Sequence, residues 1–400
     1  MIIKMKSKSI LTIFSAVLVV TSLLILLQAA TPVTLWPAAV LATGTTWYVA
    51  PTPTGTSSSG GSCSHPGYNT ISAAIAAASP GPATVNVCTG TYVEQLTISE
   101  PLILTGVGNP TIQAPTTMTA DASGSMNIVT ITGSLTTASL SGFTVTGPTT
   151  THCGGSLVDG YVGIFVRDGA TANIVRNTIK DITDNPLDGD QCGQGIIVGR
   201  AAFSTVGHAT ISYNDIFDYQ KSGIVVDDTG STAVITHNTV TGVGLTAAIG
   251  QNGIQVSSGA VAAVDSNTVS GNEYGGSGSG PDLILDTQSA GLLLYQSGSG
   301  TSVTNNAVSA NDRGIVLYQA SSATAVEHNI LNNNRYAGIA LEDGTYTASN
   351  NSVFGGNVGI AAVADASNTS VTLTMNTISG VTASIGAYTR SGLTATVLSS

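Results

Sequence analysis

The sequence predicts an all-β fold, a parallel β-solenoid made of short stacked coils. Two motifs recur eight times each and alternate along the chain: Gly, Ile or Leu, any residue, aliphatic; and Asn, any residue, aliphatic. A unit of about 23 residues cannot bury a core alone, so such units must stack. The first motif begins at Gly163, Gly195, Gly223, Gly253, Gly291, Gly314, Gly338 and Gly359. The second begins at Asn177, Asn214, Asn238, Asn267, Asn306, Asn329, Asn351 and Asn376.

The residues around each Asn support this interpretation. Three positions before and two positions after it the chain carries mostly Ile, Val or Leu, as at Ile174 and Ile179 around Asn177. β-Branched residues fill a narrow stacked core well. We therefore expect these side chains to point inward and the Asn side chains to form a hydrogen-bonded ladder between coils.

The N-terminal segment resembles an export signal. Three lysines precede an apolar run over residues 10–27. We expect residues 1–42 to be a signal peptide cut after Ala42, or an uncleaved membrane anchor, because the run is long enough to span a bilayer. Either alternative places residues 43–400, the expected solenoid domain, in an extracellular or cell-surface location.

The next segment is expected to cap the stack. Residues 46–50 predict a first strand, and residues 69–78 predict a short helix with Asn69 or Thr70 as its N-cap. Terminal coils need such a cover against edge pairing. We expect the cap to span residues 46–98 and the regular coils about residues 99–380.

Three motifs of the cap region resemble a known group. They are Thr-Ile-x-x-Ala-Ile at 70–75, Val-x-Val-Cys-x-Gly-Thr-Tyr-x-Glu at 85–94 and Leu-x-Leu-x-Gly at 102–106. This order is similar to the start of secreted right-handed parallel β-helix proteins, a superfamily that includes pectate lyases, pectin methylesterases and alginate epimerases. The resemblance covers roughly residues 46–380 and implies a single-stranded right-handed parallel β-helix with a short N-terminal capping helix. The motifs specific to those enzymes are absent, so no reaction is transferred.

The cysteines indicate the redox compartment, and the net charge disfavours one class of partner. Four cysteines fit an oxidising compartment, and we expect the disulfides Cys63–Cys88 and Cys153–Cys192. The alternative, a metal site, lacks the short ligand spacing of zinc sites. The net charge of −11 disfavours a nucleic-acid partner. A polysaccharide or cell-wall glycan is the expected partner of a monomer that meets membranes only through its N-terminal segment.

Long insertions follow Asn177, Asn238 and Asn267 in the same sector of the coil. Insertions on one face of a repeat protein often form its binding face. We therefore expect them to form one wall of a lateral groove.

Beside that wall, Lys221 is the most informative candidate. A lysine with a lowered pKa can remove the C5 proton of a uronate, or it can neutralise the sugar carboxylate. The alternative is a solvated lysine paired with an aspartate. Asp227 and Asp228 are candidate catalytic carboxylates for glycoside hydrolysis, or residues that simply form a turn.

Candidate substrate-binding residues lie in the following coils. Amides at Gln251, Asn252 and Gln255 suit sugar hydroxyls because they both donate and accept hydrogen bonds. Tyr274 and Tyr295 are candidates for stacking on sugar rings, with ordinary packing as the alternative.

An aspartate-rich loop is a candidate calcium site. Asp181, Asp184 and Asp188 supply oxygen ligands, and Asp190 lies in the same loop. Its spacing matches no EF-hand, and Asx-turns explain the residues equally well.

These features favour a secreted carbohydrate-active protein that binds an extended polysaccharide in a lateral groove. If it is catalytic, uronate elimination or epimerisation is favoured over hydrolysis, because Lys221 has no obvious pair of carboxylates. The alternatives are a non-catalytic adhesin or glycan-binding module and, third, a structural stalk. The sequence does not decide whether the protein is an enzyme.

Overall fold

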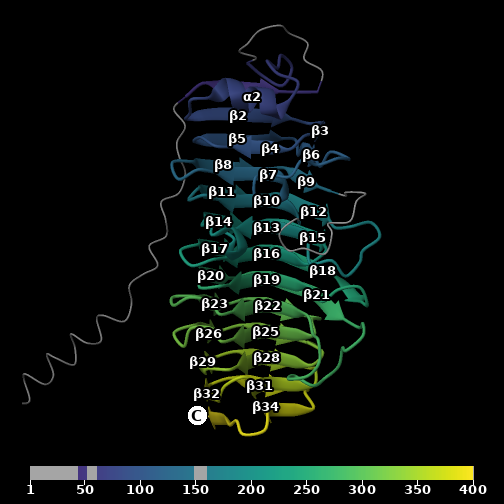
Figure 1. Cartoon of the computed structure of the whole chain (residues 1–400), viewed down its shortest axis with the longest axis vertical. Helices are drawn as coiled ribbons and strands as arrows, with labels where there is room; N and C mark the ends of the chain where they lie inside the picture. The colour runs from purple at the N-terminus through teal and green to yellow at the C-terminus, as the bar shows by residue number, and fades with distance from the viewer. Residues whose placement is uncertain (1–43, 52–60, 148–159, 400) are drawn as a thin grey trace, which may run out of the picture. The chain divides into compact units, whose positions relative to one another are not determined.

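The computed structural model describes residues 44–51, 61–147 and 160–399, which form a stack of coils (Figure 1). Each regular coil gives one short strand to each of three parallel sheets. Along the chain, a second-sheet strand is followed by a first-sheet strand and then by a third-sheet strand. The predicted all-β parallel solenoid is therefore confirmed.

The strands of each sheet follow one another in chain order, and the counts refer to the described residues. The first sheet has thirteen strands: β1 Thr46–Val49, β2 Ala83–Cys88, β5 Leu102–Val107, β8 Thr137–Ser141, β11 Thr171–Val175, β14 His208–Ser212, β17 Thr232–Thr236, β20 Val261–Asp265, β23 Ser302–Thr304, β26 Ala325–Glu327, β29 Thr345–Ser349, β32 Thr369–Thr374 and β35 Ala395–Ser399. The second has eleven: β4 Leu96–Ile98, β7 Met126–Thr132, β10 Tyr161–Arg167, β13 Gln194–Val198, β16 Ser222–Asp227, β19 Asn252–Ser257, β22 Ala290–Tyr295, β25 Arg313–Tyr318, β28 Ala337–Glu342, β31 Val358–Ala364 and β34 Ala383–Thr389. The third has eleven: β3 Thr91–Val93, β6 Thr111–Gln113, β9 Thr144–Thr146, β12 Thr178–Ile182, β15 Asp215–Tyr219, β18 Thr239–Thr246, β21 Thr268–Tyr274, β24 Ala307–Ser309, β27 Ile330–Asn332, β30 Ser352–Phe354 and β33 Thr377–Ser379.

The core fills the inside of the coils with aliphatic side chains stacked in register. Ile174 of β11 pairs with Ile211 of β14, and Ile179 of β12 pairs with Ile216 of β15. All four side chains are fully buried. The columns around the repeated Asn are thus inward positions, as the sequence predicted.

The predicted ladder of asparagine amides is present. From Asn177 to Asn376, each Nδ2 donates to Oδ1 of the Asn in the next coil at 2.9–3.1 Å. The residue before each Asn has a left-handed backbone, as at His237 with φ 57°. The ladder lies at the turn between the first and third sheets and satisfies polar groups that the turn buries.

A second, shorter amide ladder was not predicted. Asn272 donates to Asn311 at 2.9 Å, and Asn311 donates to Asn334 at 3.0 Å. Oδ1 of Asn272 also accepts from the buried hydroxyl of Tyr219 at 2.6 Å. Asn311 and Asn334 come shortly after the third-sheet strands β24 and β27, and Asn272 lies near the end of β21, so this ladder supports the path that leads into the second sheet.

The cap contains helix α2, Ile71–Ala78. Thr70 is the N-cap, and its hydroxyl accepts from the backbone N–H of Ala73 at 3.3 Å. The carboxylate of Glu94 accepts from the backbone N–H groups of Ile71 and Ser72 at 2.8 and 2.9 Å. The predicted helix is confirmed, and its buried apolar side chains cover the first coil.

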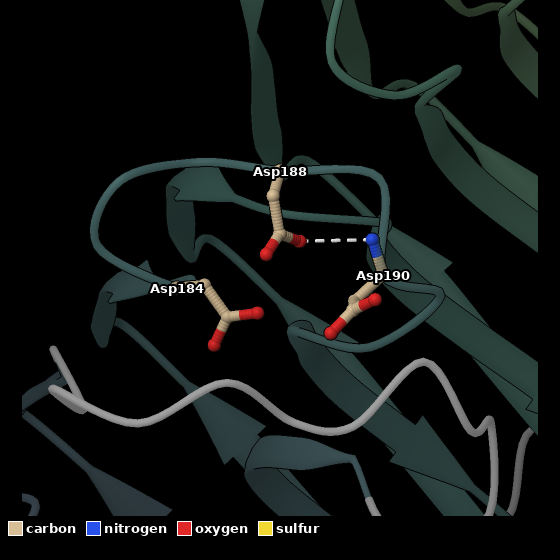
Figure 2. A group of neighbouring side chains, drawn as sticks. All are labelled: Asp184, Asp188 and Asp190. Atoms are coloured by element: carbon tan, nitrogen blue, oxygen red, sulfur yellow. Dashed lines mark hydrogen bonds between the residues drawn. The ribbon is translucent and has the colours of Figure 1, made fainter.

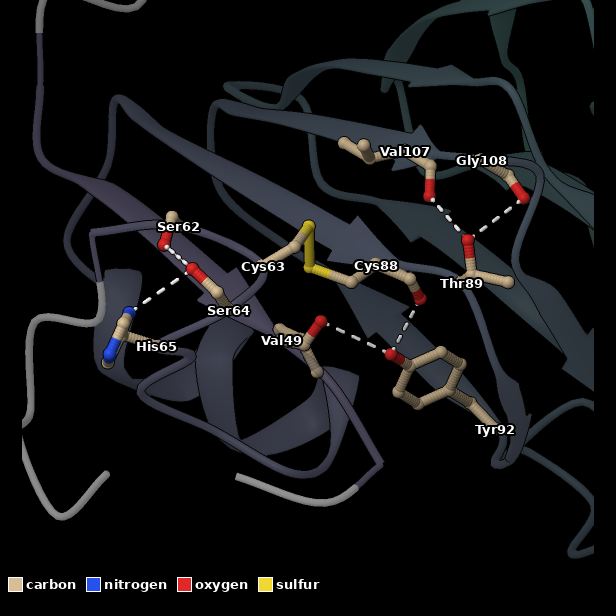
Figure 3. Close-up of a disulfide and its surroundings, with 10 residues drawn as sticks. All are labelled: Val49, Ser62, Cys63, Ser64, His65, Cys88, Thr89, Tyr92, Val107 and Gly108. Carbon is tan, nitrogen blue, oxygen red and sulfur yellow. Dashed lines mark hydrogen bonds between the residues drawn. A yellow bond between two sulfur atoms is a disulfide. The ribbon is translucent and has the colours of Figure 1, made fainter. Parts of the chain in front are cut away.

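A disulfide links Cys63 to Cys88, as predicted (Figure 3). The nearby Tyr92 hydroxyl donates to the carbonyl oxygen of Cys88 at 2.8 Å. The other predicted pair includes Cys153, which lies outside the described residues, as do residues 1–42 and the cut after Ala42. Within the described part of the chain, no helix has the length and apolar character needed to cross a membrane.

Candidate functional site

Three loops emerge at one edge of the second sheet. They are the acidic loop (183–193), the short loop (247–251) and the covering loop (275–289), and each joins a third-sheet strand to the next second-sheet strand. They correspond to the three predicted insertions. A methyl group added at Gly189 would lie 3.4 Å from the carbonyl oxygen of Ala248, so the acidic and short loops are neighbours.

Lys221 lies directly before β16, between these two loops. Its Nζ donates to the carbonyl oxygen of Gly250 at 2.6 Å, and its backbone N–H donates to that of Gly193 at 2.9 Å. Burial disfavours the ammonium form and lowers the pKa of Lys221 to about 8. None of the ion pairs between described residues includes Lys221. The aspartate partner that the alternative interpretation of Lys221 requires is therefore not found among those residues.

The acidic loop gathers three carboxylates (Figure 2). Oxygens of Asp184, Asp188 and Asp190 all lie within 4.8 Å of one another, and Oδ1 of Asp188 accepts from the backbone N–H of Asp190 at 2.9 Å. The buried amide of Gln220, next to Lys221, donates to Asp184 and Asp188 at 3.3 and 3.0 Å. Carboxylate oxygens gathered in this way are the ligand type that calcium prefers.

Asp181 lies outside this group. Its Oδ2 accepts from the Thr146 hydroxyl at 3.0 Å and pairs with Nζ of Lys180 at 3.1 Å. The structure thus places Asp190, rather than Asp181, beside Asp184 and Asp188.

The candidate carboxylates Asp227 and Asp228 lie at the end of β16. Oδ1 of Asp227 accepts from the Ser257 hydroxyl at 2.8 Å, and Oδ2 accepts from the backbone N–H of Ala201 at 2.9 Å. Asp228 follows in a turn with φ 81°. At about 3.3 Å per residue, Asp227 lies about 20 Å along the strand from Lys221. The structure therefore does not bring the lysine and these aspartates together.

The amide residues divide into two groups. Asn252 donates to Gln255 at 3.1 Å, and Gln255 donates to Ser257 at 3.1 Å, which continues to Asp227. Gln251, in contrast, is fully buried: its Nε2 donates to the carbonyl oxygen of Tyr219 at 2.6 Å, and its Oε1 accepts from a backbone N–H at 2.9 Å. Asn252 and Gln255 therefore form one polar chain that Gln251 does not join.

The two candidate tyrosines also differ. Tyr274 ends β21, and its hydroxyl donates to the carbonyl oxygen of Ser277 inside the covering loop at 3.2 Å. Tyr295 ends β22, is 42% exposed and stacks on Tyr318 of the next coil with centroids 5.1 Å apart and planes 6° apart. Tyr295 thus presents an aromatic surface to solvent.

A pair of buried charges beside these tyrosines was not predicted. Arg313 of β25 contacts Glu342 of β28 through Nη1 and Oε2 at 3.3 Å. Burial raises the pKa of Glu342 to about 7, although Arg313 opposes the shift. Charged residues make up only 8% of the chain, so two of them at strand positions are the sequence signal for this pair.

Asp312 fastens the covering loop at both ends. Its Oδ2 accepts from the backbone N–H of Tyr274 at 2.8 Å and from that of Ser289 at 2.9 Å, and its Oδ1 pairs with Arg335 at 3.0 Å. The side chain is fully buried, and burial raises its pKa above the usual range although these partners oppose the shift. The carboxylate of Asp312 therefore holds the two ends of the covering loop together.

A cavity of about 550 Å³ lies away from these residues, at the cap. Helix α2 and β4 line it, with Ile75, Gln95 and Glu100 among its walls. It contains none of the candidate catalytic, substrate-binding or metal-binding residues. The chemistry described above is instead grouped along the second sheet and its loops.

Several solved structures resemble this fold. The A-module of the Azotobacter vinelandii mannuronan C-5 epimerase AlgE4 is 16% identical, with 82% of this chain and 94% of that chain covered and a TM-score of 0.48. The Agl-KA catalytic domain is 14% identical, with 82% and 64% covered and a TM-score of 0.52. The GH136 lacto-N-biosidase from Eubacterium ramulus is 12% identical, with 86% and 68% covered and a TM-score of 0.50. At these identities the likeness concerns the fold alone.

No curated protein sequence gives a significant match. The family model described as "Right handed beta helix region" matches residues 102–269 and 194–378, which together make up most of the coils. The predicted right-handed parallel β-helix is thereby confirmed. The chain belongs to the right-handed β-helix family.

Proposed function

We propose that this protein is a carbohydrate-active β-helix protein that acts on a uronate polysaccharide outside the cell, by elimination or epimerisation, with Lys221 as the base. The observation that carries the proposal is the half-buried Lys221 with a pKa of about 8 beside the acidic loop. A neutral amine at that place can remove the C5 proton of a uronate. In elimination the electron pair expels the glycosidic oxygen at C4, whereas in epimerisation a proton returns to the opposite face.

The sugar carboxylate must be neutralised before its C5 proton becomes acidic enough to transfer. We propose that Asp184, Asp188 and Asp190 hold a calcium ion for this purpose. Their oxygens are the ligand type that calcium prefers, and Gln220, the residue directly before Lys221, donates a hydrogen bond to Asp188 at 3.0 Å. The lacto-N-biosidase that shares the fold is named for a glycan substrate, which supports only the carbohydrate-active part of the proposal. The disulfide Cys63–Cys88 fits an oxidising, extracellular location.

A second candidate function is glycan binding without catalysis, as in an adhesin. The polar chain from Asn252 through Gln255 to Asp227 favours it, because such groups hydrogen-bond sugar hydroxyls without acid–base chemistry. The exposed ring of Tyr295 would add a stacking surface.

One screen distinguishes these functions. The purified protein is incubated with acidic and neutral polysaccharides, with calcium or with a chelator. Ultraviolet absorbance reports unsaturated sugars, proton NMR reports epimerised residues and a reducing-end assay reports hydrolysis. We expect unsaturated or epimerised product that Lys221→Ala abolishes and that the control Lys180→Ala retains. Binding without product in the wild type supports the adhesin, and new reducing ends without unsaturation contradict the assigned role of Lys221.

A further inference from the structure

We propose that the site accepts the end of a glycan chain, about two or three sugar residues, and excludes the interior of a long polymer. The inference rests on the proposed function and specifies which part of the substrate the site can reach. It follows from where the outer face of the second sheet is exposed, and where it is covered. This face is seen in the middle of Figure 1, along β10 to β31.

One column of side chains shows the limits of the exposed area. At the middle of each second-sheet strand, one residue points away from the core, and these residues are paired from coil to coil. Phe165, Ile197 and Val225 are buried and pack with Phe203. Val316, Ala340 and Ala361 are also buried, whereas Gln255 and Leu293, which lie between these two groups, are only partly buried. The column runs through Phe165, Ile197, Val225, Gln255, Leu293, Val316, Ala340 and Ala361.

We call the area around Gln255, Leu293, Tyr295 and Tyr318 the window. Val225 above it is 2% exposed and Val316 below it is 1% exposed. These residues are three coils apart, which at about 4.8 Å per coil is about 14 Å, roughly three pyranose rings end to end. A polymer that ran along the solenoid would have to cross one of the two covered regions.

The covering loop closes the lower side of the window. Leu283 of this loop is buried in one cluster with Val316 and Ala340 of the sheet. Asp312 holds both ends of the loop through backbone N–H groups at 2.8 and 2.9 Å. Because the loop is held at both ends and in its middle, it blocks access to the sheet from this side, and moving it would expose apolar surface.

The third side is closed where the strands begin. Ser222, Asn252 and Ala290 are paired neighbours at that edge, and all three are buried. The opposite edge is open at one place: Tyr295 is 42% exposed and stacks on the partly exposed Tyr318, whereas Ser257 and Glu342 on either side are buried. With three sides closed, a glycan can enter only past the tyrosines, and its leading residue then meets Gln255. Asn252, which donates to Gln255 at 3.1 Å, also donates its backbone N–H to the carbonyl oxygen of Lys221 at 2.9 Å, so the leading residue is the one that comes nearest to Lys221.

The test is a length series on the wild-type protein. Oligogalacturonates and oligomannuronates from dimer to octamer, and the parent polymers in several length fractions, are titrated by calorimetry in the presence of calcium. We expect affinity per chain to stop rising at the trimer and the polymers to bind one protein per chain end, whatever their length. Tyr295→Ala should weaken trimer binding about tenfold, while Tyr213→Ala, a similarly exposed tyrosine on another turn, should not.

The outcomes separate the inference from the proposed function. Binding stoichiometry that grows with polymer length overturns the inference and leaves the proposed function standing. No binding to any member of either series overturns both. A variant with residues 276–288 replaced by a Gly-Ser linker should gain binding to the polymer interior. If that variant does not fold, the wild-type series still decides.

Discussion

Lys221 gives the sharpest prediction, because its pKa reports both how strongly the amine is buried and how well it can act as a base. Its amine is held at Gly250 in a half-buried place, and its pKa is lowered from 10.5 to about 8. At pH 7 this raises the neutral fraction of the amine from about 0.03% to about 9%, about 300-fold. Activity that depends on the neutral amine should therefore rise about tenfold per pH unit up to pH 7 and level off above pH 8.

The same shift predicts a change in stability with pH. Since the folded pKa lies below the unfolded value, the unfolded chain binds more protons between pH 8 and pH 10.5. The free energy of unfolding should rise across that window by up to about 3 kcal/mol. Lys221→Met removes the titrating group, so this variant should lack the contribution.

The assay is competitive acetylation of lysines across pH, read by mass spectrometry, with a model lysine peptide as reference. Lys221 should label with a midpoint near pH 8. Thermal melting of wild type and Lys221→Met at pH 8 and pH 10.5 measures the stability difference. A labelling midpoint above pH 10, or identical pH dependence of the two melting temperatures, refutes the reasoning.

Three further predictions concern the amide ladder and the buried carboxylates. Asn267→Ala leaves buried partners in both neighbouring coils unsatisfied and should cost about 4 kcal/mol, whereas the exposed Asn332→Ala should cost almost nothing. Chemical denaturation measures both, and equal effects would contradict a structural role of the ladder. Asp312→Ala frees both ends of the covering loop, so amide exchange there should accelerate at least tenfold; unchanged protection would show that the loop is held otherwise. The raised pKa of Glu342 means that wild-type stability should fall as pH rises from about 4.5 to about 7. Glu342→Gln should flatten this fall in thermal melts, and an unchanged fall would assign it to other groups.

The fold could be predicted because every coil carries its core residues at the same positions of the sequence repeat. Each coil carries the same inward residues around its Asn, and that periodicity survives insertions of any length. The second ladder at Asn272, Asn311 and Asn334 was not apparent. Each of its members lies five residues after a repeated Asn, but only three consecutive coils carry an Asn at that position, so it does not stand out as a repeat of the whole chain.

The site was less predictable because strand alternation changes phase at the repeated glycine. Strict alternation would place Gln251, Gly253 and Gln255 on one face. A Cβ at Gly253 would instead lie 2.4 Å from Val269 Cγ1, toward the core. Gln251 accordingly turns inward, while Gln255 faces the window. Only the backbone path of the coil, which the sequence does not specify, separates these two glutamines.

The long asparagine ladder also has a direction. From Asn177 to Asn351 every side-chain amide donates to Oδ1 of the Asn in the following coil, while its Nδ2 also donates to a backbone carbonyl oxygen of the preceding coil. The side-chain amide dipoles therefore point the same way along the row. Hydrogen bonds aligned in this way polarise one another, and each is strengthened by those on both sides. A break in the middle leaves two short rows, whereas a break at Asn376 shortens the row by one. The coils are therefore energetically coupled along the stack, and the cost of losing one amide depends on its place in the row.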